Sequence, residues 1–167
     1  NIIRPLDIIM IIQSSLSNRK QQIFNSSLKI AEKSDIMFQH GCVATCGGKI
    51  IARGYNTYKN YTKRDNFLKN TCTCHAEVNV LRQIYHRSKK RNNERKMRRV
   101  VLYISRAGTK DNHVNNSAPC HRCMEVINKL NVKQIIFYLD KEFYIMKPHE
   151  YTRKHYTFGE AYLERSQ

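Results

Sequence analysis

Two cysteines lie three positions apart in the stretch Ser117-Ala118-Pro119-Cys120-His121-Arg122-Cys123. Pro119 suits the first position of a helix, so the thiols of Cys120 and Cys123 are predicted to lie on one face of its opening turns. This spacing is typical of a metal clip. Apolar residues continue the same face at helical spacing and predict that it turns toward a core: Met124, Ile127 and Leu130.

A second stretch, Cys74-His75-Ala76-Glu77, supplies His75 as a third candidate ligand. One imidazole and two thiolates suit zinc in a tetrahedral field. Three protein ligands leave the fourth position open, and water bound in such a position has a pKa lowered to roughly 7 and can attack an electrophilic carbon. The pattern therefore predicts a catalytic zinc site rather than a closed structural one.

Glu77 is predicted to lie on the buried side of the helix that follows His75. It shares an apolar stripe with the residues three, four and seven positions ahead: Val80, Leu81 and Ile84. A buried carboxyl group is explained either by an arginine partner or by catalysis. We favour catalysis, in which a desolvated Glu77 with a raised pKa takes a proton from water and delivers it to the substrate nitrogen and the leaving amine.

The order His-x-Glu followed by Pro-Cys-x-x-Cys resembles the signature of zinc-dependent nucleobase deaminases. Over about residues 24–140 the chain is identified as a member of the cytidine deaminase-like superfamily, and it resembles most the deoxycytidylate and tRNA adenosine deaminase branch, whose first ligand is histidine. The resemblance implies an α/β fold, namely a three-layer α/β/α domain with a mixed central sheet. It also implies zinc as the cofactor, with these site residues: His75, Cys120 and Cys123 as ligands, Glu77 as proton carrier, and the Ala76 backbone and Asn56 as substrate contacts.

The hydrophobic pattern predicts the elements of this fold. They are helices over about 17–34, 75–87 and from Pro119, and strands over 42–46, 49–53, 100–104, 132–138 and 143–146, with hairpin turns at Gly47-Gly48 and Asp140-Lys141. The antiparallel final hairpin is more typical of nucleoside-type deaminases, whereas His75 favours the other branch. We give the ligand more weight, but the long separation between Glu77 and Pro119 leaves the substrate subclass open.

The chain is strongly basic, with a formal charge of +17 from 30 Lys and Arg against 13 Asp and Glu. Such a charge favours an anionic partner, although biased composition and solubility alone would also produce it. A basic stretch from Arg87 to Arg99 contains Glu94 as its single acid. We expect a nucleotide substrate, nucleic acid as a possible partner of this stretch, no membrane, and a homo-oligomer.

Six cysteines without a visible signal peptide indicate reduced thiols and metal ligands, and hence the cytosol or nucleus. The apolar run 6–12 is too short to span a bilayer and is predicted to be a core or partner-facing segment. We expect an N-terminal extension over 1–20, a deaminase domain over 21–147, and a packed C-terminal tail over 148–167. Because residue 1 is Asn, an upstream segment is left open.

Other assignments remain open at this point. Cys72 and Cys74 lie beside His75 and would either complete a closed four-cysteine site with Cys120 and Cys123 or hold a second zinc. Cytosine in a nucleotide such as deoxycytidylate is the first substrate expectation, and a base in RNA or DNA is the second. An inactive, zinc-stabilised nucleic-acid-binding module is the alternative from another class.

Overall fold

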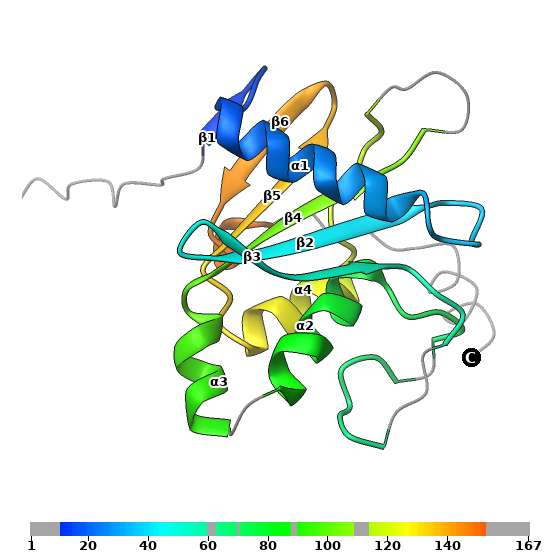
Figure 1. Cartoon of the computed structure of the whole chain (residues 1–167), viewed down its shortest axis with the longest axis vertical. Coiled ribbons are helices and arrows are strands. Elements are labelled where there is room, and N and C mark those ends of the chain that lie inside the picture. Colours follow the sequence, from blue (N-terminus) through cyan, green and yellow to red (C-terminus); the bar gives the residue numbers. More distant parts are fainter. Residues whose placement is uncertain (1–10, 60–62, 70, 88–89, 109–113, 153–167) are drawn as a thin grey trace, which may run out of the picture.

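The structure, a computed structural model, describes residues 11–59, 63–69, 71–87, 90–108 and 114–152. A six-stranded mixed sheet has the strand order β1-β6-β5-β4-β2-β3 and is covered by helices on both faces (Figure 1). The strands are β1 (Ile11–Gln13), β2 (His40–Cys46), β3 (Lys49–Tyr55), β4 (Val100–Arg106), β5 (Gln134–Leu139) and β6 (Glu142–Met146). The helices are α1 (Asn18–Ala31), α2 (Ala76–His86), α3 (Lys90–Met97), α4 (His121–Lys129) and a short 3-10 helix, η1 (Pro148–Glu150).

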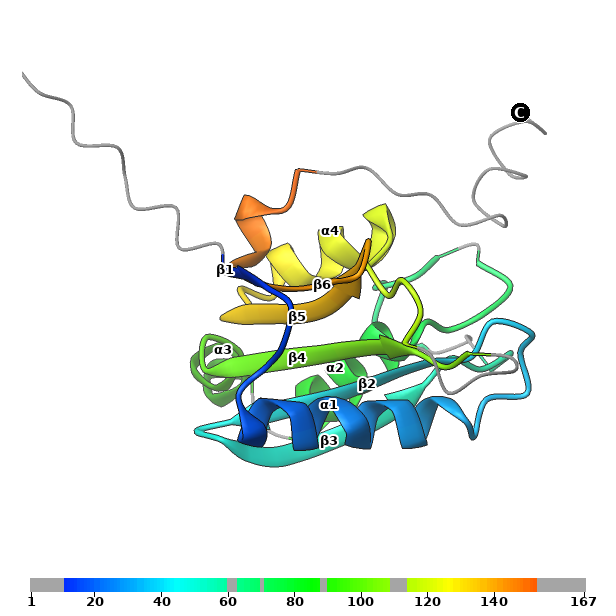
Figure 2. The same ribbon diagram turned by 90° about the horizontal axis from the view of Figure 1, so that it is seen from above.

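Two hydrophobic cores lie on opposite faces of the sheet, because side chains alternate along each strand. In the central strand β4, Leu102 and Ile104 join the core beneath α2 and α4, whereas Tyr103 joins the core beneath α1. The neighbouring strands β2 and β5 alternate in the same way. Figure 1 shows α1 on one face of the sheet and α2, α3 and α4 on the other, and Figure 2 looks onto the face that α1 covers, so the predicted three-layer α/β/α fold is confirmed.

The two predicted hairpins are confirmed. β2 pairs with β3 and β5 with β6, both antiparallel, while β4 and β5 form a parallel pair. The turn residues have positive φ angles, 58° and 76° at Gly47 and Gly48 and 50° and 69° at Asp140 and Lys141. Two successive residues of this kind form the tight turn whose twist suits a hairpin.

Gly54 in β3 lets α2 pack close to the sheet. A Cβ atom at this position would lie 2.9 Å from Cγ2 of Val80 and 3.1 Å from Cγ of Asn79, both in α2. The first distance is shorter than real Cβ contacts and the second is tighter than most of them, so the close packing of α2 on β3 depends on the missing side chain.

Three elements were not predicted, namely α3, β1 and the short helix η1. α3 forms within the basic stretch, where Met97 and Asn93 are buried and the Asn93 amide donates a hydrogen bond to the carbonyl of Tyr85. β1 pairs with the edge of β6, and its residues Ile11 and Ile12 are each 43% exposed. The predicted C-terminal tail over 148–167 lies outside the described residues beyond position 152. Among the described helices, none has the length and apolarity needed to cross a membrane.

Candidate active site

The N-termini of α2 and α4 meet beneath the sheet and bring the two sequence motifs together. His75 is the N-cap residue of α2 and Cys120 is the N-cap residue of α4, both with extended backbone. Pro119 therefore precedes the N-cap instead of opening the helix, which corrects the predicted boundary by two positions. The cause is that the Cys120 side chain accepts the backbone N–H of Cys123, a bond that only a residue outside the helix can make.

Three possible metal ligands converge here. Nδ1 of His75 lies 3.2 Å from Sγ of Cys123 and 3.3 Å from Sγ of Cys120, and the three atoms all lie within 4.8 Å of one another. Zinc binds sulfur at about 2.3 Å and histidine nitrogen at about 2.0 to 2.1 Å, so tetrahedral ligand atoms are roughly 3.6 Å apart. The observed spacing fits one zinc ion with small adjustments.

The surroundings of Cys120 favour its thiolate form. Its hydrogen bond with the Cys123 side chain opposes the effect of burial and, together with the nearby His75 ring, lowers the pKa of Cys120 to about 4. The backbone N–H of Cys123 also points at the Cys120 sulfur at the positive end of α4. Zinc binds thiolates rather than thiols, so this site is prepared for a cation.

Glu77 lies in the first turn of α2 and is only 4% exposed, as the helical pattern predicted. Burial raises the pKa of its carboxyl group to about 7, and the negative charge of Cys120 adds to this effect. The arginine of the same helix, Arg82, pairs with Asp65 instead of Glu77. A carboxyl group of this pKa can both accept and donate a proton near neutral pH.

Asn56 lies just beyond the end of β3 and is 7% exposed. Its Oδ1 accepts the backbone N–H of His40 at 2.9 Å, and its Nδ2 donates to the carbonyl of Phe38 at 2.7 Å. These bonds hold the Asn56 side chain against the segment that leads into β2. The next residue, Thr57, pairs with Cys74 through two backbone hydrogen bonds, which ties the Asn56 segment to the residue before His75.

A buried ionic cluster beside the site was missed by sequence reasoning. The side chain of Asp65 is 2% exposed and bonds Nε of Arg82 at 3.1 Å and Nε2 of His86 at 2.7 Å. Burial opposes ionisation of Asp65, but the hydrogen bonds from His86, from the Phe67 backbone and from Arg82 lower its pKa. The cluster fastens the loop after β3 onto α2. Its one sequence signal was the pair Arg82 and His86, four residues apart on one helix.

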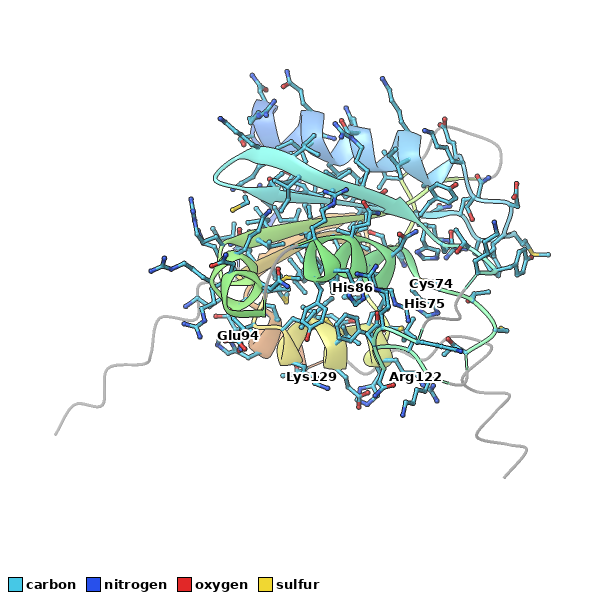
Figure 3. The ribbon with its side chains drawn as sticks, turned by 60° about the horizontal axis from the view of Figure 1, so that its bottom comes forward. Cys74, His75, His86, Glu94, Arg122 and Lys129 are labelled. Carbon is cyan, nitrogen blue, oxygen red and sulfur yellow. The ribbon has the colours of Figure 1, made fainter. Side chains whose placement is uncertain are left out.

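The alternative roles for Cys72 and Cys74 find no support in the described part of the chain. Only His75, Cys120 and Cys123 form a metal-binding group there. The thiol of Cys74 instead contacts the Arg82 guanidinium at 3.3 Å, and Cys72 is exposed. Figure 3 shows Cys74 and His75 together at one end of α2. His121, between the two cysteines, turns outward and pairs with Glu125 at 3.2 Å.

Comparison with known proteins agrees with this geometry. Residues 17–139 match the family model described as the cytidine and deoxycytidylate deaminase zinc-binding region. Cytidine deaminase from Burkholderia pseudomallei superposes with a TM-score of 0.55 and 13% sequence identity, over 81% of this chain and 95% of that one. For dCMP deaminase from the cyanophage S-TIM5 the values are 0.48 and 19%, over 72% of this chain and 82% of that one. No curated protein matches the sequence.

The superposition on the Burkholderia enzyme supports the assignment of the fold. The family model supports the fold and also the assignment to a deaminase family. The matched region covers over half of the chain and contains His75, Glu77, Cys120 and Cys123. Its cofactor is zinc, and His75 and the two cysteines are positioned to hold it. The chain therefore belongs to the family of deaminases defined by the cytidine and deoxycytidylate deaminase zinc-binding region.

Proposed function

We propose that this chain hydrolytically deaminates cytosine in a (deoxy)cytidine nucleotide such as deoxycytidylate, giving a uracil nucleotide and ammonia. One observation supports this function most directly: the nearly buried carboxyl group of Glu77 lies two residues beyond His75, whose ring contacts both Cys120 and Cys123. Zinc held by these three residues would act as a Lewis acid that activates a water molecule.

Glu77 has the task of moving protons in this reaction. Water oxygen adds at the ring carbon that bears the amino group, the bond from that carbon to the amine breaks, and ammonia leaves. A proton must therefore pass from water to the ring nitrogen and another to the leaving amine. A carboxyl group with a pKa of about 7 is matched to both transfers at neutral pH.

Two further residues are proposed as substrate contacts. Ala76 is the first residue of α2, where backbone N–H groups lack helical partners and can donate to a base. Asn56 uses Oδ1 and one N–H of its amide to hold the neighbouring backbone. Its second amide N–H and the remaining acceptor capacity of Oδ1 are the groups proposed to contact the substrate.

The test is a Glu77→Gln variant, which keeps the shape of the side chain but cannot carry the proton. We expect at least ~10²-fold loss of turnover, the usual scale for a positioned acid or base, with the zinc content retained. Glu125→Gln is the matched control, because Glu125 is an exposed glutamate of α4. Turnover that is equal in the two variants would reject the role of Glu77.

A second candidate function is deamination of a base within RNA or single-stranded DNA. It is favoured by aromatic side chains in the loops around Asn56: Phe38 is 41% exposed and Tyr58 is 65% exposed. The Arg106 guanidinium lies 4.6 Å from the centre of the Phe38 ring. Exposed aromatic rings beside cations stack the bases of single strands.

Substrates offered side by side separate these functions. Purified protein is given deoxycytidylate, cytidine, adenosine-containing RNA and single-stranded DNA, and the release of ammonia and the modified base is measured. We expect the highest rate with deoxycytidylate. A higher rate on RNA or DNA would select the second function, and zinc-loaded protein inactive on all four would select the binding module. The expected homo-oligomer is checked by sedimentation equilibrium.

A further inference from the structure

Cations from separate parts of the chain gather along β3, which is an edge strand of the sheet. Lys49 and Arg53 belong to the strand and are exposed. Arg19 at the start of α1 donates to the carbonyl of Gly48 at 3.2 Å. Arg87 at the end of α2 donates to the carbonyl of Ile51 at 2.9 Å. Segments distant in sequence thus place positive charge along the same edge.

The segment around α3 extends this positive surface. Arg98 and Arg99 follow the helix directly and are exposed. A Cβ atom added at Gly47 would lie 3.5 Å from Nη2 of Arg99, so this guanidinium group reaches the hairpin turn between β2 and β3. Figures 1 and 2 both show α3 at the same end of the sheet as that turn. We call the following six residues the basic edge: Arg19, Lys49, Arg53, Arg87, Arg98 and Arg99.

Negative charge is nearly absent around the basic edge. Glu94 is the one acidic residue in the sequences of α1, β2, β3, α3 and the segment joining α2 to β4. In the described part of the chain, the acids that form ion pairs are Asp65 and Glu125, and none of these pairs involves a member of the basic edge. Six exposed cations with Glu94 as the one acid in the neighbouring segments produce a positive field that attracts an anionic partner.

The basic edge is separate from the candidate active site. α2 has 11 residues, so at 1.5 Å per residue about 16 Å of helix lies between the His75 end and the Arg87 end. Figure 3 shows His75 and Glu94 at opposite ends of this region. A single nucleotide bound at the zinc site would not reach the basic edge.

The arrangement fits a polymer with regularly repeated negative charge. β3 has seven residues and spans about 20 Å, whereas one strand of a duplex presents a phosphate about every 3.4 Å along its axis. Five of the six cations are arginines, which bind phosphate oxygens in pairs. The basic edge contains no aromatic side chain for stacking on bases. We propose that the basic edge binds the phosphate backbone of a nucleic acid without reading its sequence.

The test uses the full chain with zinc bound and fluorescently labelled 20-nucleotide probes, namely single-stranded DNA, single-stranded RNA and duplex DNA. Fluorescence anisotropy gives the affinity for each probe over a series of salt concentrations. For the wild type we expect binding at low salt and a logarithmic slope steeper than about −2, because each neutralised phosphate contributes about −0.7 to −0.9. Which probe binds best identifies the natural source of the backbone.

The decisive variant is Lys49→Glu with Arg98→Glu, because neither side chain makes a hydrogen bond or an ion pair within the described residues. We expect at least ~10-fold weaker binding and a slope that is shallower by about 1.5. The matched control is Lys129→Glu with Lys141→Glu, which has the same net charge but changes exposed lysines in α4 and in the β5–β6 turn. The control should bind like the wild type.

Other outcomes overturn the inference. These are absence of binding to every probe at 50 mM salt, equal loss of binding in the decisive and control variants, or displacement of the probe by polyglutamate at equal charge concentration. If the charge reversal prevents folding, Lys49→Gln with Arg98→Gln serves instead and should also flatten the slope. Turnover of free deoxycytidylate should not change in these variants, so failure of the proposed activity and failure of the basic edge are distinguishable.

Discussion

Substitution of Gly54 by alanine should damage the metal centre, although Gly54 does not belong to it. The added Cβ would lie 2.9 Å from Cγ2 of Val80 and 3.1 Å from Cγ of Asn79. Carbon atoms pack about 3.5 to 4.0 Å apart, so β3 and α2 must separate by roughly 0.5 to 1 Å. Overpacking of this kind lowers the free energy of unfolding by about 1–3 kcal/mol.

The same displacement reaches the candidate active site because both obstructed residues belong to α2. That helix begins directly after His75 and includes Glu77, while the two cysteines are held on α4. The bond from Nδ2 of Asn79 to the carbonyl of Tyr55, 3.0 Å long, would also be stretched. A misplacement near 1 Å can cost about 10²-fold in rate, so we expect turnover to fall by about that factor and zinc to dissociate more readily.

Three measurements check this prediction: denaturant unfolding, zinc retained after dialysis against a chelator, and turnover. Val80→Ala removes the obstructing methyl group and provides a double-variant cycle with Gly54→Ala. We expect the combined loss of stability to be at least ~1 kcal/mol smaller than the sum of the single losses, because the alanine at 54 then loses its closest obstruction and only the contact with Asn79 remains. Wild-type stability and zinc retention in Gly54→Ala, or strict additivity with Val80→Ala, would refute the reasoning.

Two further predictions concern the metal and the buried ionic cluster. Cys120→Ser should not retain zinc, so a chelator should lower the melting temperature of the wild type but leave that of the variant unchanged; a zinc-dependent melting temperature in the variant would contradict this. Asp65→Asn should lower the free energy of unfolding at pH 7 by about 1.5–3 kcal/mol, the usual contribution of hydrogen bonds to a charged group. Because the folded state lowers the pKa of Asp65 from 3.8, its contribution is present above that pH and is lost as the pH falls through the folded-state pKa. The free energies of unfolding of the variant and the wild type should therefore converge below pH 4. A difference that stays constant with pH would contradict the assigned role of ionised Asp65.

The metal-binding helices could be predicted from sequence because their signals are local. Cys120 and Cys123 share one turn, and Glu77 shares an apolar stripe with the residues that follow it. The hairpins could be predicted for the same reason, from the alternation of apolar and polar residues along the strands and from the two-residue turns. Each of these patterns lies within about ten residues, so chain connectivity alone relates its members.

The features that were missed depend on contacts between distant residues. α3 is very basic, and its position depends on burial of Met97 and on the bond from Asn93 to Tyr85. Asp65 meets Arg82 and His86 only after the loop folds back onto α2. Sequence periodicity does not predict these contacts, because they depend on the conformation of the loop that contains Asp65.

The contacts that β6 makes with β1 and α1 affect how the chain folds during its synthesis on the ribosome. Ile11 pairs with Ile145, and the ring of Phe24 in α1 packs edge-on against Phe143 at 5.1 Å. α1 therefore receives part of its apolar cover from β6, which is synthesised more than 100 residues later. Until β6 emerges from the ribosome, the apolar surface of α1 that packs against Phe143 stays exposed to solvent and accessible to chaperones.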